Sequence, residues 1–269
     1  MVLYKRLVSI TNVLWSYTWK LFVPLIILLG LSQGYFLYNN FANGTFQNIY
    51  DQNRYDTNAY NQLKPWSLRY EEYLARSYVK EIFIFALLIT IIILVSISLR
   101  QKLASKTEYT FLRLPVSRFT WFSTNVVYAS SVLAILFAVQ FIIILAGYQM
   151  YLYFVPEEAV MTQGLFLAFA RWDFLNMFFP IINPYKIIIN VLYIIHTGIL
   201  ITYINMIVLL KSNRRLTILA ALFPLLINDF EGISGFVFVI VILLVIDLWM
   251  VYSYRSMLKE LGEGEQQDA

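Results

Sequence analysis

The sequence predicts an all-α, polytopic membrane protein with six transmembrane helices, and three observations carry this prediction. First, 60% of the residues are hydrophobic and only 13% are charged, against about half and about a quarter in soluble proteins. Second, several apolar stretches approach the roughly 20 residues that a helix needs to cross about 30 Å of hydrocarbon. Third, lysine and arginine gather in alternate connections between these stretches, which places both termini in the cytoplasm.

The first 20 residues have the pattern of a helix that lies in the membrane surface. Apolar residues such as Leu3 and Leu7 recur at helical spacing, while Lys5 and Asn12 share the opposite face. We therefore expect an N-terminal amphipathic, interfacial helix over residues 1–20. The alternative is that these residues are simply the cytoplasmic start of the first span.

Five apolar stretches predict transmembrane helices by their length. They cover residues 21–38, 81–99, 120–147, 187–210 and 233–254. A sixth stretch, 216–229, would reach only about 21 Å as a helix at 1.5 Å per residue, so we expect it to be thin, tilted or partly re-entrant. With the N-terminus inside, most of the basic residues near span ends fall on the cytoplasmic side, which supports an even number of spans.

The segment 160–182 is long enough to be a seventh span. Its centre carries Arg171 and Asp173, and a charge at the bilayer midplane costs about 2.5–3.5 kcal/mol even on the lenient insertion scale. Counting it as a span would also place the basic cluster near Lys211 on the outer side. We therefore expect a re-entrant or interfacial helix on the outer side, with a true span as the alternative.

Two segments outside the spans complete the predicted organisation of this single transmembrane domain. Residues 40–79 are expected to form an extracellular loop that caps the outer face, with 67–79 helical and running into the second span. Residues 256–269 are expected to form a cytoplasmic tail, disordered and acidic after Leu261.

Several kinds of site are excluded by the residues that the sequence lacks. The chain contains no cysteine, which excludes thiolate metal sites, and no G-x-x-x-x-G-K-[ST] loop, which excludes ATP hydrolysis through a P-loop. His196 is the only histidine, so a two-histidine zinc site cannot form within one chain. Glu71 to Arg76 fits the E-E-x-x-x-R pattern of intramembrane proteases, but those enzymes need further histidines. We expect no catalytic residue, no metal site, no cofactor in this chain and no nucleic-acid partner.

Asp247 is the one acid deep in an apparent span, and an ionisable group inside a membrane is a functional candidate by default. One interpretation places it in a translocation path. The other is structural: Asp247 meets a polar group on a neighbouring helix or approaches the inner interface, since Arg255 follows about two turns later. His196 is best explained as a polar residue that faces other helices.

The cytoplasmic segment 100–119 is the most informative part of the sequence. It is basic at both ends, contains a single acid, Glu108, and sets apolar residues such as Leu114 and Pro115 among the charges. A simple turn between two spans needs only a few residues. Apolar anchors within a charged rim are suited to docking into a groove on a soluble partner. The alternative is an interfacial helix held by anionic lipid.

The run from Lys106 to Arg118, KTEYTFLRLPVSR, resembles the segment that follows the second span in type-2 ABC exporter permeases. In that family, a basic stretch and an acid-small-x-small pattern precede L-P-[VI]-S-R, which leads into the third span. The six-span layout, the amphipathic start and the missing ATPase extend the resemblance in outline over the whole chain.

The resemblance implies a non-catalytic permease subunit that pairs with a second permease subunit, identical or homologous, and with two cytoplasmic ATP-binding subunits that hold ATP and magnesium. It implies a coupling segment over 101–118 that inserts into a groove of the ATPase. The residues expected to contact or orient the ATPase are Glu108, Arg113, Leu114, Pro115 and Arg118. The family often has a re-entrant element between the fifth and sixth spans, whereas here the extra segment, 160–182, lies between the third and fourth.

The resemblance and the aromatic content favour export of a peptide, a lipid or a hydrophobic drug across a cell membrane, and a bacterial plasma membrane is expected. Two alternatives stay open. One is a membrane-embedded sensor or immunity subunit that shares the architecture without transporting anything. The other is an intramembrane enzyme, which would need acids or histidines clustered at one depth.

Overall fold

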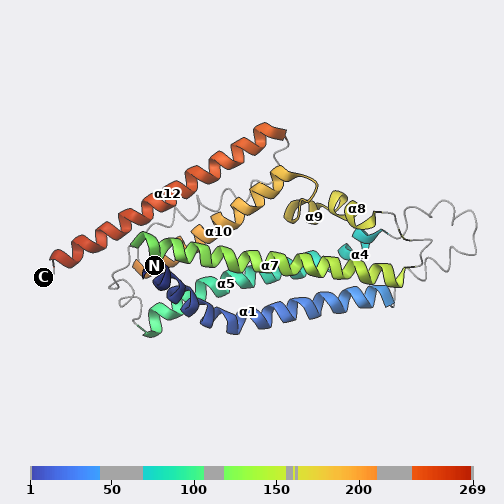
Figure 1. The fold of residues 1–269 in the computed structure, drawn as a ribbon, viewed down its shortest axis with the longest axis horizontal. Helices are drawn as coiled ribbons and strands as arrows, with labels where there is room; N and C mark the ends of the chain where they lie inside the picture. The colour runs from blue at the N-terminus through green and yellow to red at the C-terminus, as the bar shows by residue number, and fades with distance from the viewer. Residues whose placement is uncertain are drawn as a thin grey trace, which may run out of the picture. The chain divides into compact units, whose positions relative to one another are not determined.

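The structure is a computed structural model that describes residues 2–42, 69–105, 118–155, 160, 163–210 and 232–267. Within these ranges, all regular secondary structure is helical (Figure 1). The all-α prediction is therefore confirmed for the part of the chain that is described.

Five long helices dominate the fold. They are α1 (Val2–Ala42), α5 (Val79–Ser105), α7 (Arg118–Phe154), α10 (Pro184–Leu210) and α12 (Gly232–Gln267). Each contains a segment long and apolar enough to cross a membrane, and the five segments coincide with the five clear spans expected from the sequence. The chain is thus a multi-pass helical protein by length and composition, while the expected sixth stretch, 216–229, lies outside the described residues.

Several helices extend beyond the predicted spans. α1 has no end near residue 20, so the expected interfacial helix and the first span belong to one continuous helix that contains Pro24. The apolar segment of α7, Phe119–Phe154, has 36 residues and would measure about 54 Å at 1.5 Å per residue, well beyond a 30 Å hydrocarbon layer.

The expectation of a disordered tail is wrong for the described residues, because α12 continues to Gln267. The sequence after Tyr254 contains three Glu, two Gln and two Leu residues, which are strong helix formers. These residues extend the helix past Gly262 and Gly264, although each glycine is less favourable than alanine by about 1 kcal/mol.

The helices are divided between two compact units. The first unit contains Met1–Phe22, Ile89–Ala134 and Ile188–Ala269, and the second contains Val23–Leu88 and Ile135–Ile187. Four of the long helices contribute to both units, whereas α12 lies wholly in the first.

The second unit contains three short helices beside the long ones. α4 (Tyr70–Arg76) lies within the expected outer loop, and its end is marked by Tyr78, whose φ of 53° is in the left-handed region. The predicted helix over 67–79 is therefore shorter and does not run directly into α5. Burial raises the pKa of the Tyr70 hydroxyl, with the nearby Tyr148 adding to the effect, and this hydroxyl donates a hydrogen bond of 2.5 Å to the Ile144 carbonyl oxygen.

The segment 160–182 forms two short helices instead of the one that was expected. α8 (Gly164–Arg171) and α9 (Asp173–Phe178) are separated by Trp172, whose backbone is extended. Eight residues of helix reach about 12 Å, so neither helix is long enough to cross a bilayer. Phe174 and Phe178 pack edge-on against Phe83 of α5, which fixes α9 to the second unit.

The start of α10 follows the usual chemistry of a helix N-terminus. Asn183 precedes the helix, and its side-chain oxygen accepts hydrogen bonds from the backbone N–H groups of Tyr185 at 3.1 Å and Lys186 at 3.4 Å. Pro184 occupies the first helical position, where its missing N–H has no intrahelical partner to lose. The sequence Asn-Pro therefore sets where this helix begins.

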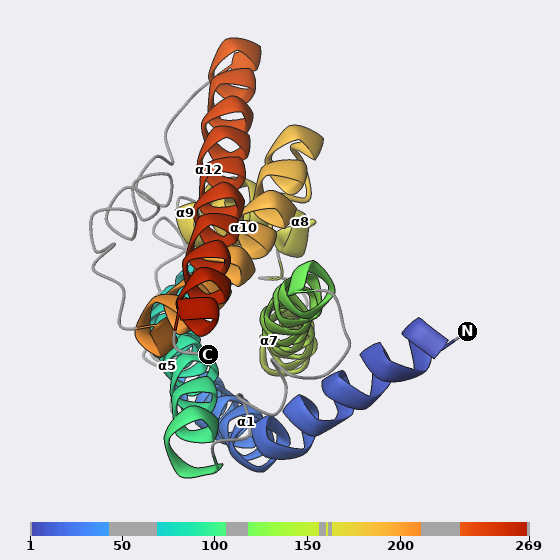
Figure 2. The ribbon, with the colours of Figure 1, turned by 90° about the vertical axis from the view of Figure 1, so that its left-hand side faces the viewer.

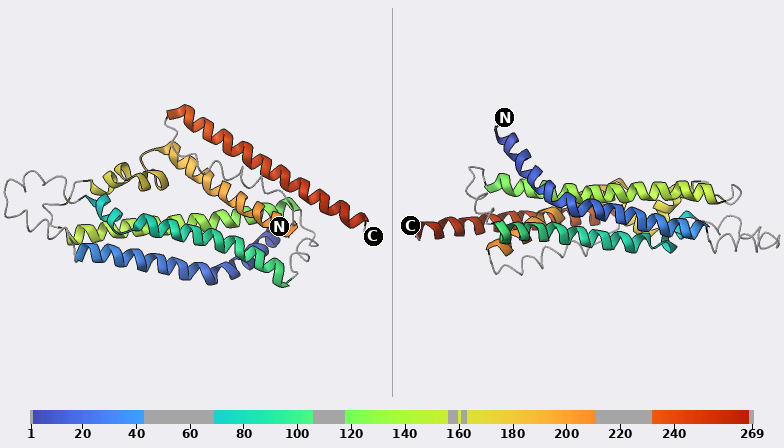
Figure 3. Two further views of the ribbon diagram at one scale, coloured as in Figure 1. Left: turned by 180° about the vertical axis from the view of Figure 1, so that it is seen from behind. Right: turned by 90° about the horizontal axis from the view of Figure 1, so that it is seen from below.

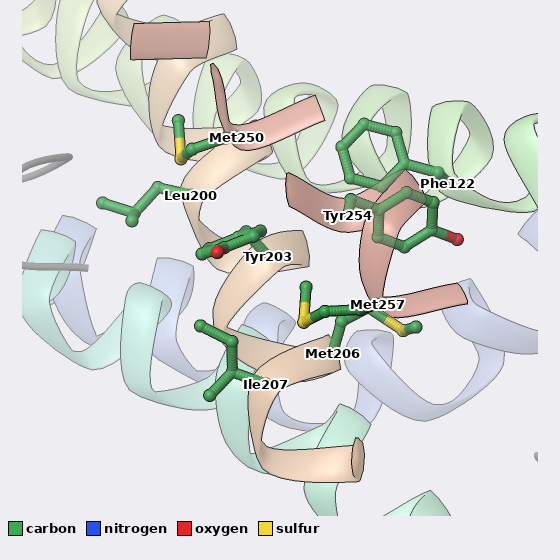
Figure 4. Packing of buried hydrophobic residues seen from close by; sticks show 8 residues of the cluster. All are labelled: Phe122, Leu200, Tyr203, Met206, Ile207, Met250, Tyr254 and Met257. Carbon is green, nitrogen blue, oxygen red and sulfur yellow. The ribbon is translucent and has the colours of Figure 1, made fainter. Parts of the chain in front are cut away.

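The core of the first unit is formed where α7, α10 and α12 meet. Figure 4 shows its eight buried side chains, namely Phe122, Leu200, Tyr203, Met206, Ile207, Met250, Tyr254 and Met257. The ring centroids of Phe122 and Tyr254 lie 4.4 Å apart. Figure 2 gives a view of α7, the helix that carries Phe122, nearly along its axis. This cluster joins three helices that are far apart in the sequence.

The contacts in the first unit also give the directions of its helices. His196 and Tyr203 of α10 contact Asp247 and Ser253 of α12 in the same order, so these two helices are parallel. Figure 3, left, shows both running the same way. α7 is antiparallel to α10, because Ser130 lies by the middle of α10 while Phe122 packs in the cluster near its end.

Candidate functional site

The most distinctive polar feature of the described helices is a short contact between a histidine of α10 and an aspartate of α12. The Nδ1 atom of His196 lies 2.6 Å from the Oδ1 atom of Asp247. The histidine side chain is fully buried and the aspartate side chain is 18% exposed. A hydrogen bond this short is typical of pairs in which at least one partner is charged.

Both partners lie at the middle of a candidate span. His196 is twelve positions after Pro184 and eleven before Ile207, the ends of its apolar segment; Asp247 is eleven after Phe236 and ten before Met257. An ionisable pair at such a depth is costly to bury and is usually retained for a functional or strongly structural reason. This pair is the candidate functional site.

A second polar contact lies further along the same two helices. The hydroxyl oxygens of Tyr203 and Ser253 are 2.7 Å apart, and both residues are buried. Interhelical contacts of this kind associate membrane helices, because lipid offers a polar side chain no alternative partner. The two contacts together align α10 with α12 over about two turns.

The backbones of α7 and α10 approach each other closely at Gly198. A Cβ atom added to Gly198 would lie 3.0 Å from the Val126 carbonyl oxygen and 2.3 Å from the Ser130 hydroxyl. The Ser130 hydroxyl also donates to the Ile194 carbonyl oxygen at 3.5 Å. Small residues permit this approach, as they do in many membrane helix pairs, and Gly198 holds α7 next to the turn that carries His196.

The nearest fixed charges on the two helices are distant from the pair. Lys186 precedes His196 by ten positions and Arg255 follows Asp247 by eight, which correspond to about 15 Å and 12 Å along a helix. The Arg255 guanidinium lies over the Phe119 ring at 5.4 Å. Of the described charged or ionisable groups on these two helices, His196 is the one in contact with Asp247.

The pair can share a proton, because an imidazole nitrogen and a carboxylate oxygen lie within hydrogen-bond distance. Among the residues that the structure describes, no group of three or more His, Cys, Asp or Glu side chains could coordinate an ion. In the second unit, Glu71 of α4 is nearly buried and its carboxylate lies 4.0 Å from the Arg171 guanidinium of α8. That contact joins two short helices and involves no histidine.

The structure describes only some of the residues that the sequence analysis named as candidates. Asp247 meets a polar group on a neighbouring helix, which is the structural alternative stated above, and its role in a translocation path stays a prediction. Sequence reasoning considered Asp247 and His196 separately and did not pair them. The remaining expected residues, Glu108, Arg113, Leu114 and Pro115, lie outside the described residues, and Arg118 is described only as the first residue of α7.

The second unit has its own buried polar contact at mid-helix. Gln33 of α1 and Gln140 of α7 exchange two hydrogen bonds of 2.9 and 3.0 Å between their side-chain amides. Gln33 also donates to the Val79 carbonyl oxygen at 3.2 Å. Both amides are fully buried, so this reciprocal pair fixes α1, α5 and α7 to one another within the unit.

Comparison of the chain with family models, with curated protein sequences and with solved structures finds no match.

Proposed function

We propose that the chain is the membrane subunit of an ABC exporter, driven by separate cytoplasmic ATP-binding subunits. The observation that carries the proposal is the run from Lys106 to Arg118, with its Leu-Pro-Val-Ser-Arg string. It connects the end of α5 at Ser105 to the start of α7 at Arg118, and both helices contain candidate spans. A segment with apolar anchors in a basic rim between two spans is suited to docking on a soluble partner.

In this proposal, two copies of the chain, or one copy and a homologous subunit, bind two ATP-binding subunits. Closure of the ATPases around ATP and magnesium moves the 101–118 segment, and the spans alternate between inward-facing and outward-facing states. The cargo is a peptide, a lipid or a hydrophobic drug, in keeping with the 17% aromatic content. The membrane is a bacterial plasma membrane.

The proposal includes six spans with both termini in the cytoplasm, and the helix directions in the first unit support it. α10 and α12 are parallel, so the end of α10 and the start of α12 lie at opposite ends of the helix pair. If both helices span the membrane, an odd number of crossings lies between them, and the proposal assigns one. The stretch 216–229 is the apolar sequence available for that crossing.

The positions of basic residues agree with this orientation. Arg255 near the end of α12 lies over Phe119 at the start of α7, so Arg118 and Arg255 belong to the same end of the first unit. Basic residues at span ends favour the cytoplasmic side. This supports the proposal that the C-terminal end of the α12 span and the coupling segment lie on the cytoplasmic side.

Single-cysteine labelling tests this topology, and the chain offers a clean background because it contains no cysteine. A membrane-impermeant maleimide is expected to label Tyr185→Cys, at the start of α10, in intact cells. Ser256→Cys, near the end of the α12 span, is expected to react only after the cells are permeabilised. Labelling of Ser256→Cys in intact cells would place the end of the α12 span outside the cell and contradict the proposal.

The coupling role is tested by placing a charge on the apolar anchor. In the chain co-expressed with the ATP-binding subunit from its own gene neighbourhood, Leu114→Asp is expected to reduce co-purification and ATP turnover at least tenfold, because a carboxylate would have to enter an apolar groove. Unchanged assembly and unchanged ATP turnover in Leu114→Asp would contradict the proposed coupling role.

A further inference from the structure

We infer that His196 and Asp247 form a proton-binding site within the membrane-spanning helices, and that the bound proton holds α10 against α12. The inference goes beyond the proposed function and does not depend on an ATPase partner. It rests on the 2.6 Å contact, on the full burial of the His196 side chain beside an Asp247 side chain that is 18% exposed, and on their position at the middle of two candidate spans.

The charge balance of the pair is the first step. With one exchangeable proton bound, the pair is either an imidazolium beside a carboxylate or a neutral imidazole beside a carboxylic acid, and its net charge is zero. When that proton leaves to the buffer, a neutral imidazole remains beside a carboxylate and the net charge is −1. A net charge is far more costly than a neutral pair in a low-dielectric interior.

The titratable, charged and neutral groups near the pair lie on α10, α12 and α7. On α10, the nearest titratable group is Tyr193, one turn before His196, and on α12 the nearest charged group is Arg255, over the Phe119 ring. α7 faces this part of α10 with Val126 and Ser130, which do not titrate. The hydroxyl of Tyr128 on α7 is hydrogen-bonded to Thr18 of α1.

The mechanical consequence follows from where the pair lies. It joins the two parallel helices of the first unit near the middle of both candidate spans, where a pair with no net charge costs less to bury than a pair with one. Loss of the proton leaves a carboxylate, which is stabilised by hydration. Asp247 is the partially exposed member of the pair, so water would reach the site on its side. The deprotonated site therefore favours a looser contact between α10 and α12 that admits water to Asp247.

The composition of the chain makes the proton directly observable. Because His196 is the only histidine, the full chain labelled with ¹⁵N-histidine in lipid nanodiscs gives one set of imidazole signals. We expect a single protonation transition between pH 5 and pH 9. Its midpoint in wild type is expected to differ from that in Asp247→Asn by one pH unit or more, which is a tenfold change in proton affinity.

The separation of the helices is measured in the same samples by spin labels. The labels replace Val191 on α10 and Leu244 on α12, which are exposed, in a chain without native cysteine. The distance distribution is expected to change at the midpoint seen by NMR, and to stay constant with pH in His196→Gln. Tyr203→Phe, which removes the hydroxyl of the second contact and leaves both members of the pair in place, is the matched control and is expected to keep the transition.

Three results would overturn the inference. They are imidazole signals that do not change from pH 5 to pH 9, a midpoint that is the same in wild type and Asp247→Asn, and an interhelical distance that does not follow the titration. The first and third are measured on the otherwise wild-type chain, so they stand even if Asp247→Asn fails to fold.

Discussion

Replacing Gly198 with alanine is expected to destabilise the first unit by about 1–3 kcal/mol, the usual range for overpacking a closely fitted core. The added Cβ would lie 3.0 Å from the Val126 carbonyl oxygen and 3.3 Å from the Ser130 backbone nitrogen. Neither atom can move without displacing α7. The Ser130 hydroxyl, at 2.3 Å from the added atom, can rotate away, so it contributes less to the cost.

Thermal unfolding of purified variants in detergent measures this effect. Gly30→Ala is the matched control, because a Cβ added at Gly30 has no atom within 4 Å, and alanine is the better helix former by about 1 kcal/mol. We expect the unfolding temperature to fall in Gly198→Ala and to be unchanged or raised in Gly30→Ala. Equal behaviour of the two variants would show that α7 and α10 do not approach as closely as described.

The second large effect is expected at the glutamine pair of the second unit. Gln140→Leu leaves the amide oxygen of Gln33 buried without the partner that now donates to it at 3.0 Å. An unsatisfied buried polar group costs about 1–3 kcal/mol. In Gln33→Leu/Gln140→Leu both amides are gone, so the double variant is expected to recover most of that loss.

A double-mutant cycle on unfolding stability isolates the interaction between the two side chains. Asn125→Leu is a suitable control, because the Asn125 amide donates within its own helix, to the Trp121 carbonyl oxygen at 2.9 Å. Its loss is expected to be smaller than that of either single glutamine variant. If the two glutamine substitutions are simply additive, the reciprocal hydrogen bonds contribute nothing to stability.

The bilayer explains why the spans were predictable and the helix ends were not. Hydrocarbon thickness sets a minimum length of apolar sequence, and all five clear stretches are helices of that length. Helix ends obey local chemistry. Asn183 and Pro184 are readable as a start signal, whereas the left-handed backbone of Tyr78 has no counterpart in its sequence, since few residues other than glycine or asparagine signal that conformation.

The candidate site shows the limit of single-sequence reasoning more sharply. Asp247 is conspicuous as a lone acid in an apolar helix, but its partner lies 51 positions away. Which faces of α10 and α12 meet depends on the rotation of each helix about its axis, which residue spacing within one helix does not give. The partners Gln33 and Gln140, 107 positions apart, were hidden for the same reason.

The two contacts between α10 and α12 have a mechanical consequence. His196–Asp247 and Tyr203–Ser253 are about 10 Å apart along the helices, and a slide of one helical turn, about 5.4 Å, would break both. Sliding is therefore a costly mode of motion, whereas a rotation that carries both helices keeps every contact. α10 and α12 are therefore expected to move as one rigid body, so a displacement of α12 near Tyr254 also displaces Asp247.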